Sequence, residues 1–360
     1  MSSSGAVRAQ DGFRARARAL VEEGAAEHGV PGVAVACLRD GRVSWMETIG
    51  VADTRTGEPI TEDTVFNVGS VSKAVAAWGA MRLVERGELR LDLPIEDVLT
   101  RWSLPESEFS DRVTLRRILS HTAGLSLHGY PGFQPGSDLP TLEESLDGAT
   151  GGRGGVFIEH EPGTRFRYSG GGFTVMQLAI EEVTGRDFAR YMRDEVLAPL
   201  GMSSSAFGWT PATLASAATP HDESGGPIRE EHFTALAAAG LNTTLRDLSR
   251  FAAASMPDAS TRAGGVLRAA TIREMHRAVG PGQGGGRGPS VTGALGYQVM
   301  TFGATTLVGH AGSNTGWEAG VFFRPKTGDG LVMMTNSSNG QRVLRPLLRA
   351  WIRDMEGGGR

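Results

Sequence analysis

Lysine and cysteine are scarce in this chain of 360 residues. Lys73 and Lys326 are the only lysines, and arginine supplies the rest of the 36 cationic side chains. The single cysteine, Cys37, lies in the apolar run VAVACL, which excludes a disulfide framework and a cysteine-based zinc cluster. A buried ammonium can lose its proton, whereas a guanidinium cannot. The two positions that retain lysine are therefore candidates for chemistry that requires an amine.

Long hydrophobic runs and an excess of positive charge are also missing. No run approaches the length of a membrane span, and the first residues carry arginines instead of the apolar segment of a secretory signal. We therefore expect a cytoplasmic protein with no membrane partner. The 36 Lys and Arg against 40 Asp and Glu give a net charge of −4, which excludes a broad basic surface for nucleic acid. The oligomeric state is not predicted.

The hydrophobic patterns predict an α/β protein in two parts. Residues 13–28 have the pattern of an amphipathic helix, and residues 71–86 that of a helix ending at Gly87. The segment GVAVACLRDGRVSWMETIGVAD has the pattern of two strands around a DG turn. Strand patterns resume after 290 and precede a last helix. We predict one sheet subdomain from 13–86 and 291–360, with 87–290 as an inserted, mainly helical subdomain and the active site at their junction.

Within NVGSVSK, residues 67–73, a serine and a lysine stand three positions apart at the start of a helix. Side chains at this spacing share one helix face, with Cβ atoms about 5–6 Å apart. A neutral Lys73 could take the proton of Ser70, and the free N–H groups of the helix start favour a developing oxyanion. The alternative is that Ser70 only caps the helix and Lys73 is solvated.

Three other segments carry weaker signals. Tyr168 precedes a glycine turn that opens a helix, so it is either a proton relay beside the lysine or a packed aromatic. His121, in HTAGL, fits a helix end at Gly124, and neither it nor His128 has metal-ligand spacing with a carboxylate. Residues 279–290 are glycine-rich enough to predict a mobile loop. We expect no metal and no organic cofactor.

Several motifs together resemble one family. SVSK (70–73), RYSGGGF (167–173), HAG (310–312), LSHTAGL and AAAGLNTTLRDLSRF look like the serine β-lactamase-related hydrolases. That family includes class C β-lactamases, penicillin-binding DD-peptidases, D-aminopeptidases and family VIII carboxylesterases. The resemblance runs from about residue 15 to 355. It implies the β-lactamase/DD-peptidase fold, an antiparallel sheet flanked by helices with an inserted helical subdomain.

The resemblance also implies roles for individual residues. Ser70 would be the acylated nucleophile, Lys73 its base, and Tyr168 the base or relay for the leaving group and the incoming water. His310 and Gly312 would line the cleft on a strand. The backbone N–H groups of Ser70 and Ser313 would form the oxyanion hole. The family's third motif is commonly K-T-G, and those letters occur at 326–328, but the surrounding Pro325, Gly328 and Gly330 predict a hairpin turn.

Two departures from the family pattern indicate the substrate. His310 and Ala311 stand where a lysine and a hydroxyl would hold a substrate carboxylate, and Gly170 replaces the asparagine of Tyr-x-Asn. Both losses favour a neutral, small-to-medium carboxylic ester, and family VIII carboxylesterases are the nearest match. The alternatives are a D-residue-specific peptidase or amidase, a β-lactamase, an acyltransferase and a non-catalytic ligand sensor. Tyr130 and Trp317 are candidate cleft aromatics, with ordinary packing as the equal alternative.

Overall fold

The computed structural model describes residues 3–150, 152–256, 265–285 and 288–357. Within them, a nine-stranded antiparallel sheet runs in the order β3-β2-β1-β12-β11-β10-β9-β8-β7, and a smaller sheet in the order β4-β6-β5. The strands are β1 (Gly32–Arg39), β2 (Arg42–Asp53), β3 (Glu58–Pro59), β4 (Val65–Asn67), β5 (Ala206–Phe207), β6 (Leu241–Thr244), β7 (Gly282–Gly284), β8 (Ser290–Gly293), β9 (Gln298–Phe302), β10 (Thr305–Asn314), β11 (Trp317–Arg324) and β12 (Asp329–Thr335). The predicted fold class is confirmed.

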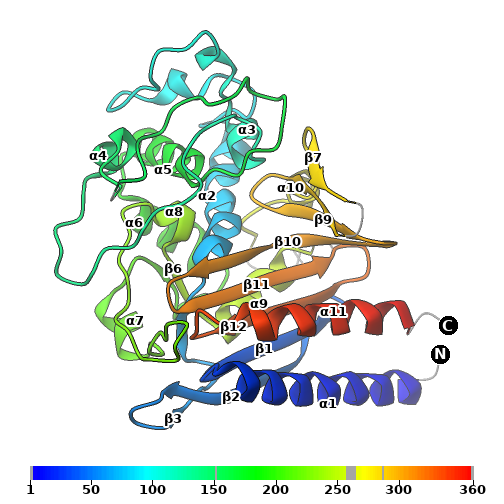
Figure 1. Cartoon of the computed structure of the whole chain (residues 1–360). Coiled ribbons are helices and arrows are strands. Elements are labelled where there is room, and N and C mark those ends of the chain that lie inside the picture. The colour runs from blue at the N-terminus through cyan, green and yellow to red at the C-terminus, as the bar shows by residue number, and fades with distance from the viewer. Residues whose placement is uncertain (1–2, 151, 257–264, 286–287, 358–360) are drawn as a thin grey trace.

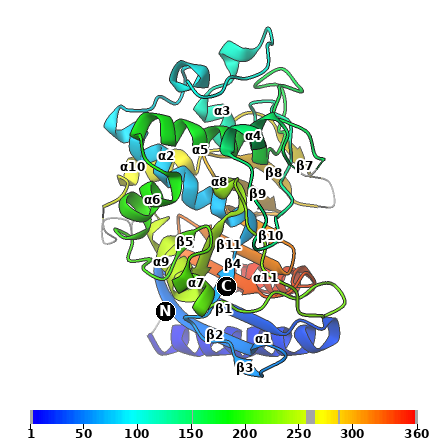
Figure 2. The ribbon, with the colours of Figure 1, turned by 90° about the vertical axis from the view of Figure 1, so that its left-hand side faces the viewer.

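Helices lie on both faces of the large sheet and in a separate layer above it (Figures 1 and 2). The α-helices are α1 (Ser3–His28), α2 (Ser72–Arg86), α3 (Leu115–Leu119), α4 (Leu142–Asp147), α5 (Gly170–Thr184), α6 (Phe188–Met192), α7 (Pro211–Ala215), α8 (Leu236–Ala239), α9 (Leu245–Ala254), α10 (Ala269–Met275) and α11 (Gln341–Gly357). Short turns of other helix types are η1 (Gly69–Val71), η2 (Ile95–Val98), η3 (Ser110–Arg112) and η4 (Arg193–Leu197). In the described residues, no helix is long and apolar enough to cross a bilayer.

Strand β1 shows how the sheet separates two cores. Its Val33, Val35 and Cys37 side chains belong to the core under α1 and α11. Its alternate residues, such as Ala34 and Ala36, belong to the larger core that contains α2. Because successive side chains of a strand point to opposite faces, a strand covered on both faces is apolar throughout. This explains why VAVACL has no polar residue.

The turns expected from the sequence occur at residues with positive φ. Asp40 and Gly41 have φ values of +51° and +68°, as a two-residue hairpin between β1 and β2 requires. Gly87, at φ +77°, ends α2. Lys326 lies in the turn between β11 and β12, which confirms the predicted hairpin tip. Two strands and α11 follow the HAG segment of β10, which is the order that the family pattern requires.

Two local expectations are wrong. The glycine-rich residues 279–290 were expected to be a mobile loop, yet β7 pairs with β8 in register from Gly282↔Thr292 to Gly284↔Ser290. Backbone hydrogen bonds need no side chains, so glycines can extend a sheet edge; residues 286–287 lie outside the described part. Helix α3 ends at Leu119, before the expected Gly124, because the chain reverses at His121 with φ +58°.

The division into subdomains stays a prediction. Helix α9 falls within the range assigned to the helical insertion, but it packs on β1 and β12 of the large sheet. Strand β7 likewise falls within 87–290 and extends that sheet. The layer above the sheet consists of α3, α4 and α5 with their connecting loops (Figure 2). Helix α2 lies between this layer and the sheet, with Ser70 at the turn before it.

Candidate active site

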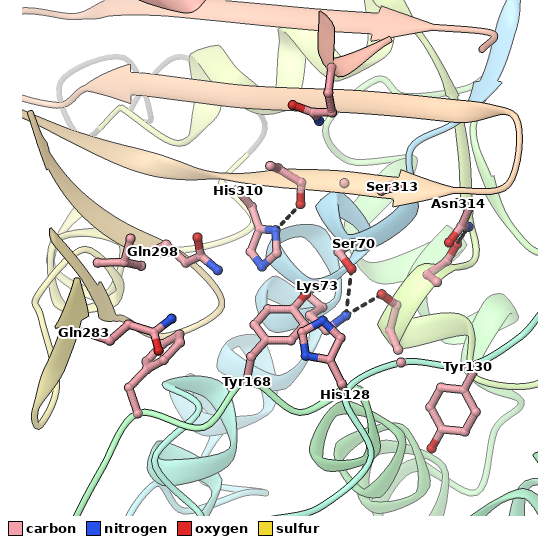
Figure 3. Close-up of a pocket in the computed structure, with 18 residues that line it drawn as sticks. Ser70, Lys73, His128, Tyr130, Tyr168, Gln283, Gln298, His310, Ser313 and Asn314 are labelled. Carbon is pink, nitrogen blue, oxygen red and sulfur yellow. Dashed lines mark hydrogen bonds between the residues drawn. The ribbon is translucent and has the colours of Figure 1, made fainter. Parts of the chain in front are cut away.

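Ser70 and Lys73 meet at the start of α2, as their spacing predicted. The Lys73 ammonium nitrogen Nζ lies 3.1 Å from Ser70 Oγ and donates a 2.7 Å hydrogen bond to the Ala238 carbonyl of α8 (Figure 3). Ser70 lies in η1, which precedes the helix. The N-cap of α2 is Val71, and no side chain caps this end. The alternative that Ser70 serves as the helix cap is therefore excluded.

The surroundings of Lys73 favour the neutral amine. The side chain is 2% exposed and lies near two aromatic rings, with Nζ 5.0 Å from the ring centre of Tyr168 and 5.6 Å from that of Phe173. Burial lowers the pKa of Lys73 from the ordinary 10.5 to about 7. A base is most effective when its pKa is close to the working pH. Near pH 7 about half of the molecules would hold an unprotonated amine beside Ser70.

Two glycines allow β10 to lie directly against the Ser70 turn. A Cβ atom on Gly312 would stand 2.0 Å from the Val68 carbonyl oxygen and 2.9 Å from the Ser70 nitrogen. A Cβ atom on Gly69, which has φ +49°, would stand 2.6 Å from the Ser313 nitrogen. Strand β11 pairs with this part of β10, whereas β9 pairs with β10 only as far as Gly309, so the edge of β10 on the β9 side is unpaired at Gly312. The Ser70 and Ser313 nitrogens thus lie at one closely packed contact.

A group of asparagines that the sequence analysis did not single out holds this contact. The Asn67 side-chain oxygen accepts hydrogen bonds from the Gly69 N–H at 2.9 Å and from Asn314 Nδ2 at 2.7 Å. Asn67 Nδ2 donates to Asn242 Oδ1 at 2.9 Å. These bonds join β4, β6 and β10 around Ser70. The only sequence signal is the asparagine two residues before Gly69, a position from which a side chain can bond the backbone of a turn.

Tyr168 is held beside Lys73 by two histidine rings and by the hydrogen bonds of the adjacent Ser169. Its ring stacks on His121, with centres 4.2 Å apart, and lies 4.8 Å from the ring of His128. His121 Nδ1 accepts the Ser169 N–H at 3.1 Å, and the Ser169 hydroxyl caps α5 by accepting the Gly172 N–H. Burial raises the pKa of Tyr168. The phenol therefore stays protonated near neutrality, which suits a relay better than a base.

His310 presents a neutral imidazole to the cleft. Its Nδ1 lies 2.6 Å from the Ala311 carbonyl oxygen, which can only accept, so this nitrogen carries a proton. Burial, with a smaller contribution from Lys73, lowers the pKa of His310 to about 3. The other nitrogen is therefore an unprotonated acceptor. This ring cannot supply the positive charge that would hold a substrate carboxylate.

The cleft has a volume of about 410 Å³ and brings most of the predicted residues together. Ser70, Lys73, Tyr168, His310, Gly312, Ser313 and Tyr130 all line it. Figure 3 shows the Tyr130 ring turned away from Ser70. Trp317 does not line the cleft, which corrects its expected position: it is 2% exposed and packs against Phe66, 6.0 Å away, and Trp209.

The structure gives a steric reason for the second departure from the family pattern, the glycine at position 170. Gly170 begins α5, and its N–H donates to the His128 carbonyl at 3.0 Å. A Cβ atom there would stand 3.0 Å from that carbonyl oxygen and 3.3 Å from the Gly129 Cα. The loop containing His128 thus occupies the space that a larger side chain at 170 would need.

Other polar side chains in the cleft were missed from the sequence. Gln283, Gln298, Gln341 and Asn314 supply neutral amides, and His128 an imidazole whose pKa burial lowers. Of the described residues that line the cleft, none is an arginine or a carboxylate, so Lys73 is the one ionisable cation of this set besides the histidines. The amides come from β7, β9, β10 and α11, and no sequence spacing shows that these elements meet at one cleft. The amides could therefore not be predicted from the sequence. Among the described residues, no three His, Cys, Asp or Glu side chains are grouped to hold a metal ion.

The architecture and this cleft define the β-lactamase/DD-peptidase fold, and comparison with known proteins identifies the family. The family model for β-lactamase matches residues 17–351, so this chain belongs to the β-lactamase family. The predicted family is thereby confirmed.

Curated relatives match parts of the chain, and two of them are a penicillin-binding protein and an esterase. Penicillin-binding protein 4 of Amycolatopsis lactamdurans is 34% identical over 179 residues, which cover 50% of this chain and 45% of that protein. Esterase EstB of Burkholderia gladioli is 32% identical over 233 residues, which cover 60% of this chain and 56% of that protein. The matched region thus spans about half the length of each relative.

Solved structures agree on the fold. The octameric penicillin-binding protein homologue from Pyrococcus abyssi superposes with a TM-score of 0.74 at 25% identity, covering 90% of this chain and 74% of that one. The β-lactamase/D-alanine carboxypeptidase from Pseudomonas syringae gives a TM-score of 0.74 at 19% identity, covering 93% and 99%. At that identity the second likeness concerns the fold alone.

Proposed function

We propose that this protein is a serine hydrolase that cleaves carboxylic esters through an acyl-enzyme on Ser70. The observation that carries the proposal is the buried Lys73 amine, 3.1 Å from Ser70 Oγ, with a pKa of about 7. A serine hydroxyl is a weak nucleophile until an adjacent base removes its proton. Lys73 meets the distance and the protonation state that such a base needs.

The geometry supports a two-step reaction. Lys73 takes the Ser70 proton as Oγ attacks the ester carbonyl, and the oxyanion accepts hydrogen bonds from the Ser70 and Ser313 N–H groups. Collapse breaks the bond to the alkoxy group, which leaves as an alcohol with the proton delivered from Lys73 through the Tyr168 hydroxyl. Water then attacks the acyl-enzyme by the reverse route, giving the carboxylic acid and restoring Ser70.

The neutrality of the cleft supports an ester over a β-lactam or a peptide carboxylate. Neither His310 nor any arginine offers a fixed positive charge at the cleft-lining strand. The esterase from Burkholderia gladioli, 32% identical to this chain over the aligned region, is consistent with this preference.

A D-residue-specific amidase is the second candidate, because Gln298 and Asn314 place amides in the cleft that could pair with a peptide group. Neutral amides of this kind could compensate for the asparagine missing at Gly170. A matched ester and amide with the same acyl group would separate the two activities. Turnover of the amide within tenfold of the ester would favour the amidase. The same acyl-enzyme could pass its acyl group to an alcohol or amine, so product analysis with an added acceptor would distinguish a transferase.

Intact mass after brief mixing with p-nitrophenyl butyrate tests the proposal directly. The wild type should gain a butyryl adduct or release nitrophenol rapidly, and Ser70→Ala should do neither. Ser103→Ala, an exposed serine outside the cleft, is the matched control and should behave as wild type. Equal hydrolysis by wild type and Ser70→Ala would overturn the assignment of Ser70. Absence of adduct and turnover in the wild type with a panel of neutral esters would instead favour a ligand sensor.

A further inference from the structure

A second cavity, of about 720 Å³, lies between α10 and strands β9, β10 and β11. It shares no lining residue with the Ser70 cleft. Figure 1 shows α10 above the ends of β9 and β10. The wall contributed by β11 continues into the turn that carries Lys326, the second of the two lysines. Its size falls in the range of about 300–1,000 Å³ that is typical of small-molecule sites.

The lining of this cavity is strongly positive. Among the described residues that line it, none is acidic and four are cationic: Arg273, Arg277, Arg324 and Lys326. The nearest acids in the sequence are engaged elsewhere. Glu274 of α10 accepts from Arg116 at 2.9 Å, and Asp329 of β12 accepts from Arg39 at 2.7 Å. In a chain with a net charge of −4, this concavity concentrates positive charge that the described residues do not neutralise.

The floor of the cavity is apolar. Val299 and Val308 face each other across β9 and β10 in direct register, and both line the cavity. Val308 is 5% exposed. Cations around an apolar floor are complementary to a ligand with an anionic group at one end and an apolar body at the other. Inorganic ions alone would leave this floor uncovered.

His276 adds an unsatisfied polar group to the same wall. Its ring lies 5.2 Å from the rings of Tyr297 and Phe323, and burial lowers its pKa to about 3. A neutral imidazole carries one N–H donor and one acceptor. Within the described part of the chain, both ring nitrogens are buried without a hydrogen-bond partner. Buried polar groups without partners are rare in folded proteins, so His276 leaves an unused donor and acceptor in the wall beside this cavity.

We propose that this cavity is a second binding site, which takes a small organic anion with an apolar body, either a carboxylate or a phosphate monoester. Arg273, Arg277, Arg324 and Lys326 bind the anionic group, and Val299 and Val308 contact the apolar body. The site is independent of ester hydrolysis, so its test does not depend on the role of Ser70.

Calorimetric titration of the whole chain with three naphthalene derivatives tests this site. The probes are 1-naphthyl phosphate, 1-naphthoate and the uncharged 1-naphthalenemethanol. Both anions should bind saturably, with the alcohol at least tenfold weaker, and the tighter anion identifies the preferred group. Arg324→Gln/Lys326→Gln should weaken anion binding at least tenfold and change binding of the alcohol by less than twofold. Arg90→Gln/Arg349→Gln, which removes two exposed cations elsewhere, should leave anion binding within twofold.

Three results would overturn the proposal. They are the absence of saturable anion binding at millimolar concentration, equal weakening by the two double variants, and an anion located in the Ser70 cleft by crystallography. Thermal melting without ligand checks that each variant is folded. If the cavity variant is unfolded, Arg273→Gln provides the same comparison with a single charge removed, and unchanged anion binding in that variant would also reject the site.

Discussion

Lys73 and Lys326 carry the same side chain in two different parts of the molecule. Lys73 is buried at the start of α2, within bonding distance of a serine and near two aromatic rings. Lys326 is exposed in the turn between β11 and β12, within the letters K-T-G. Each lies beside a cavity, and burial lowers the pKa of Lys73 to about 7. The surroundings of an amine, and not the motif letters around it, therefore determine its chemistry.

The largest effect should come from replacing the buried amine. Lys73→Arg keeps a cation in place but removes a group that can be neutral, so it cannot take the Ser70 proton. Loss of general-base catalysis should lower kcat/KM for p-nitrophenyl butyrate by about 10²–10⁴-fold. Circular dichroism and thermal melting control for folding. A folded Lys73→Arg variant with more than a tenth of the wild-type activity would show that Lys73 is not the base.

The pH dependence should give the next largest effect. The free enzyme is active with Lys73 neutral, so kcat/KM should rise through a pKa of about 7 and level off above it. Two pH units below that pKa about 1% of the amine is neutral, so kcat/KM at pH 5 should be about a hundredth of the plateau.

Direct titration can assign the limb of this profile. Reductive ¹³C-methylation of a chain with two lysines gives few signals, and Lys326→Arg identifies the Lys73 signal. That signal should titrate at the pH of the kinetic limb. If kcat/KM rises at a different pH from that at which the Lys73 signal titrates, another group causes the rise.

The features that the sequence predicted are local or belong to the family pattern. Ser70 and Lys73 meet because a spacing of three residues on a helix fixes their distance, and the order of strands after HAG follows the family. The rest depends on contacts between distant segments. Asn314 bonds Asn67 across 247 residues, and Gln283 reaches the cleft only because β7 adds to the sheet edge.

Trp317 is a candidate cleft residue from the sequence that the structure places in the core. An aromatic residue near the cleft-lining strand is a reasonable candidate from its position in the chain. Its actual surroundings include Phe66 of β4, a strand that pairs with β6 and not with β11. Without the long-range topology, a packed tryptophan and a cleft tryptophan have the same sequence signature.

A smaller effect, mainly on stability, should follow at the contact between β10 and η1. Gly312→Ala places a methyl group 2.0 Å from the Val68 carbonyl, so the strand must shift away from Ser70. Overpacking of this kind should lower the free energy of unfolding by about 1–3 kcal/mol. Ester hydrolysis should fall with it, because the Ser70 and Ser313 N–H groups would separate.

Gly12→Ala is the matched control for that substitution. Gly12 lies in α1, where the nearest atom to an added Cβ is the flexible end of Arg16 at 3.5 Å. Alanine there should raise the free energy of unfolding by about 0.5–1 kcal/mol, because glycine loses more backbone entropy in a helix. Denaturant unfolding measures both variants. Wild-type stability and hydrolysis in Gly312→Ala would contradict the close approach of β10 to Ser70.

The smallest effect should come from the K-T-G letters themselves. Thr327 is exposed, and its hydroxyl donates to Asp329 at 2.6 Å within the same turn. Thr327→Ala should change the free energy of unfolding by no more than about 0.5 kcal/mol and kcat/KM by less than twofold. Steady-state kinetics with the same ester would measure this. The turn follows Arg324, at the end of β11, whereas Gly312 beside Ser70 pairs with Ala319 near the start of that strand. A folded Thr327→Ala variant that loses hydrolysis would therefore mean that residues 326–328, and not His310–Gly312, supply the third motif.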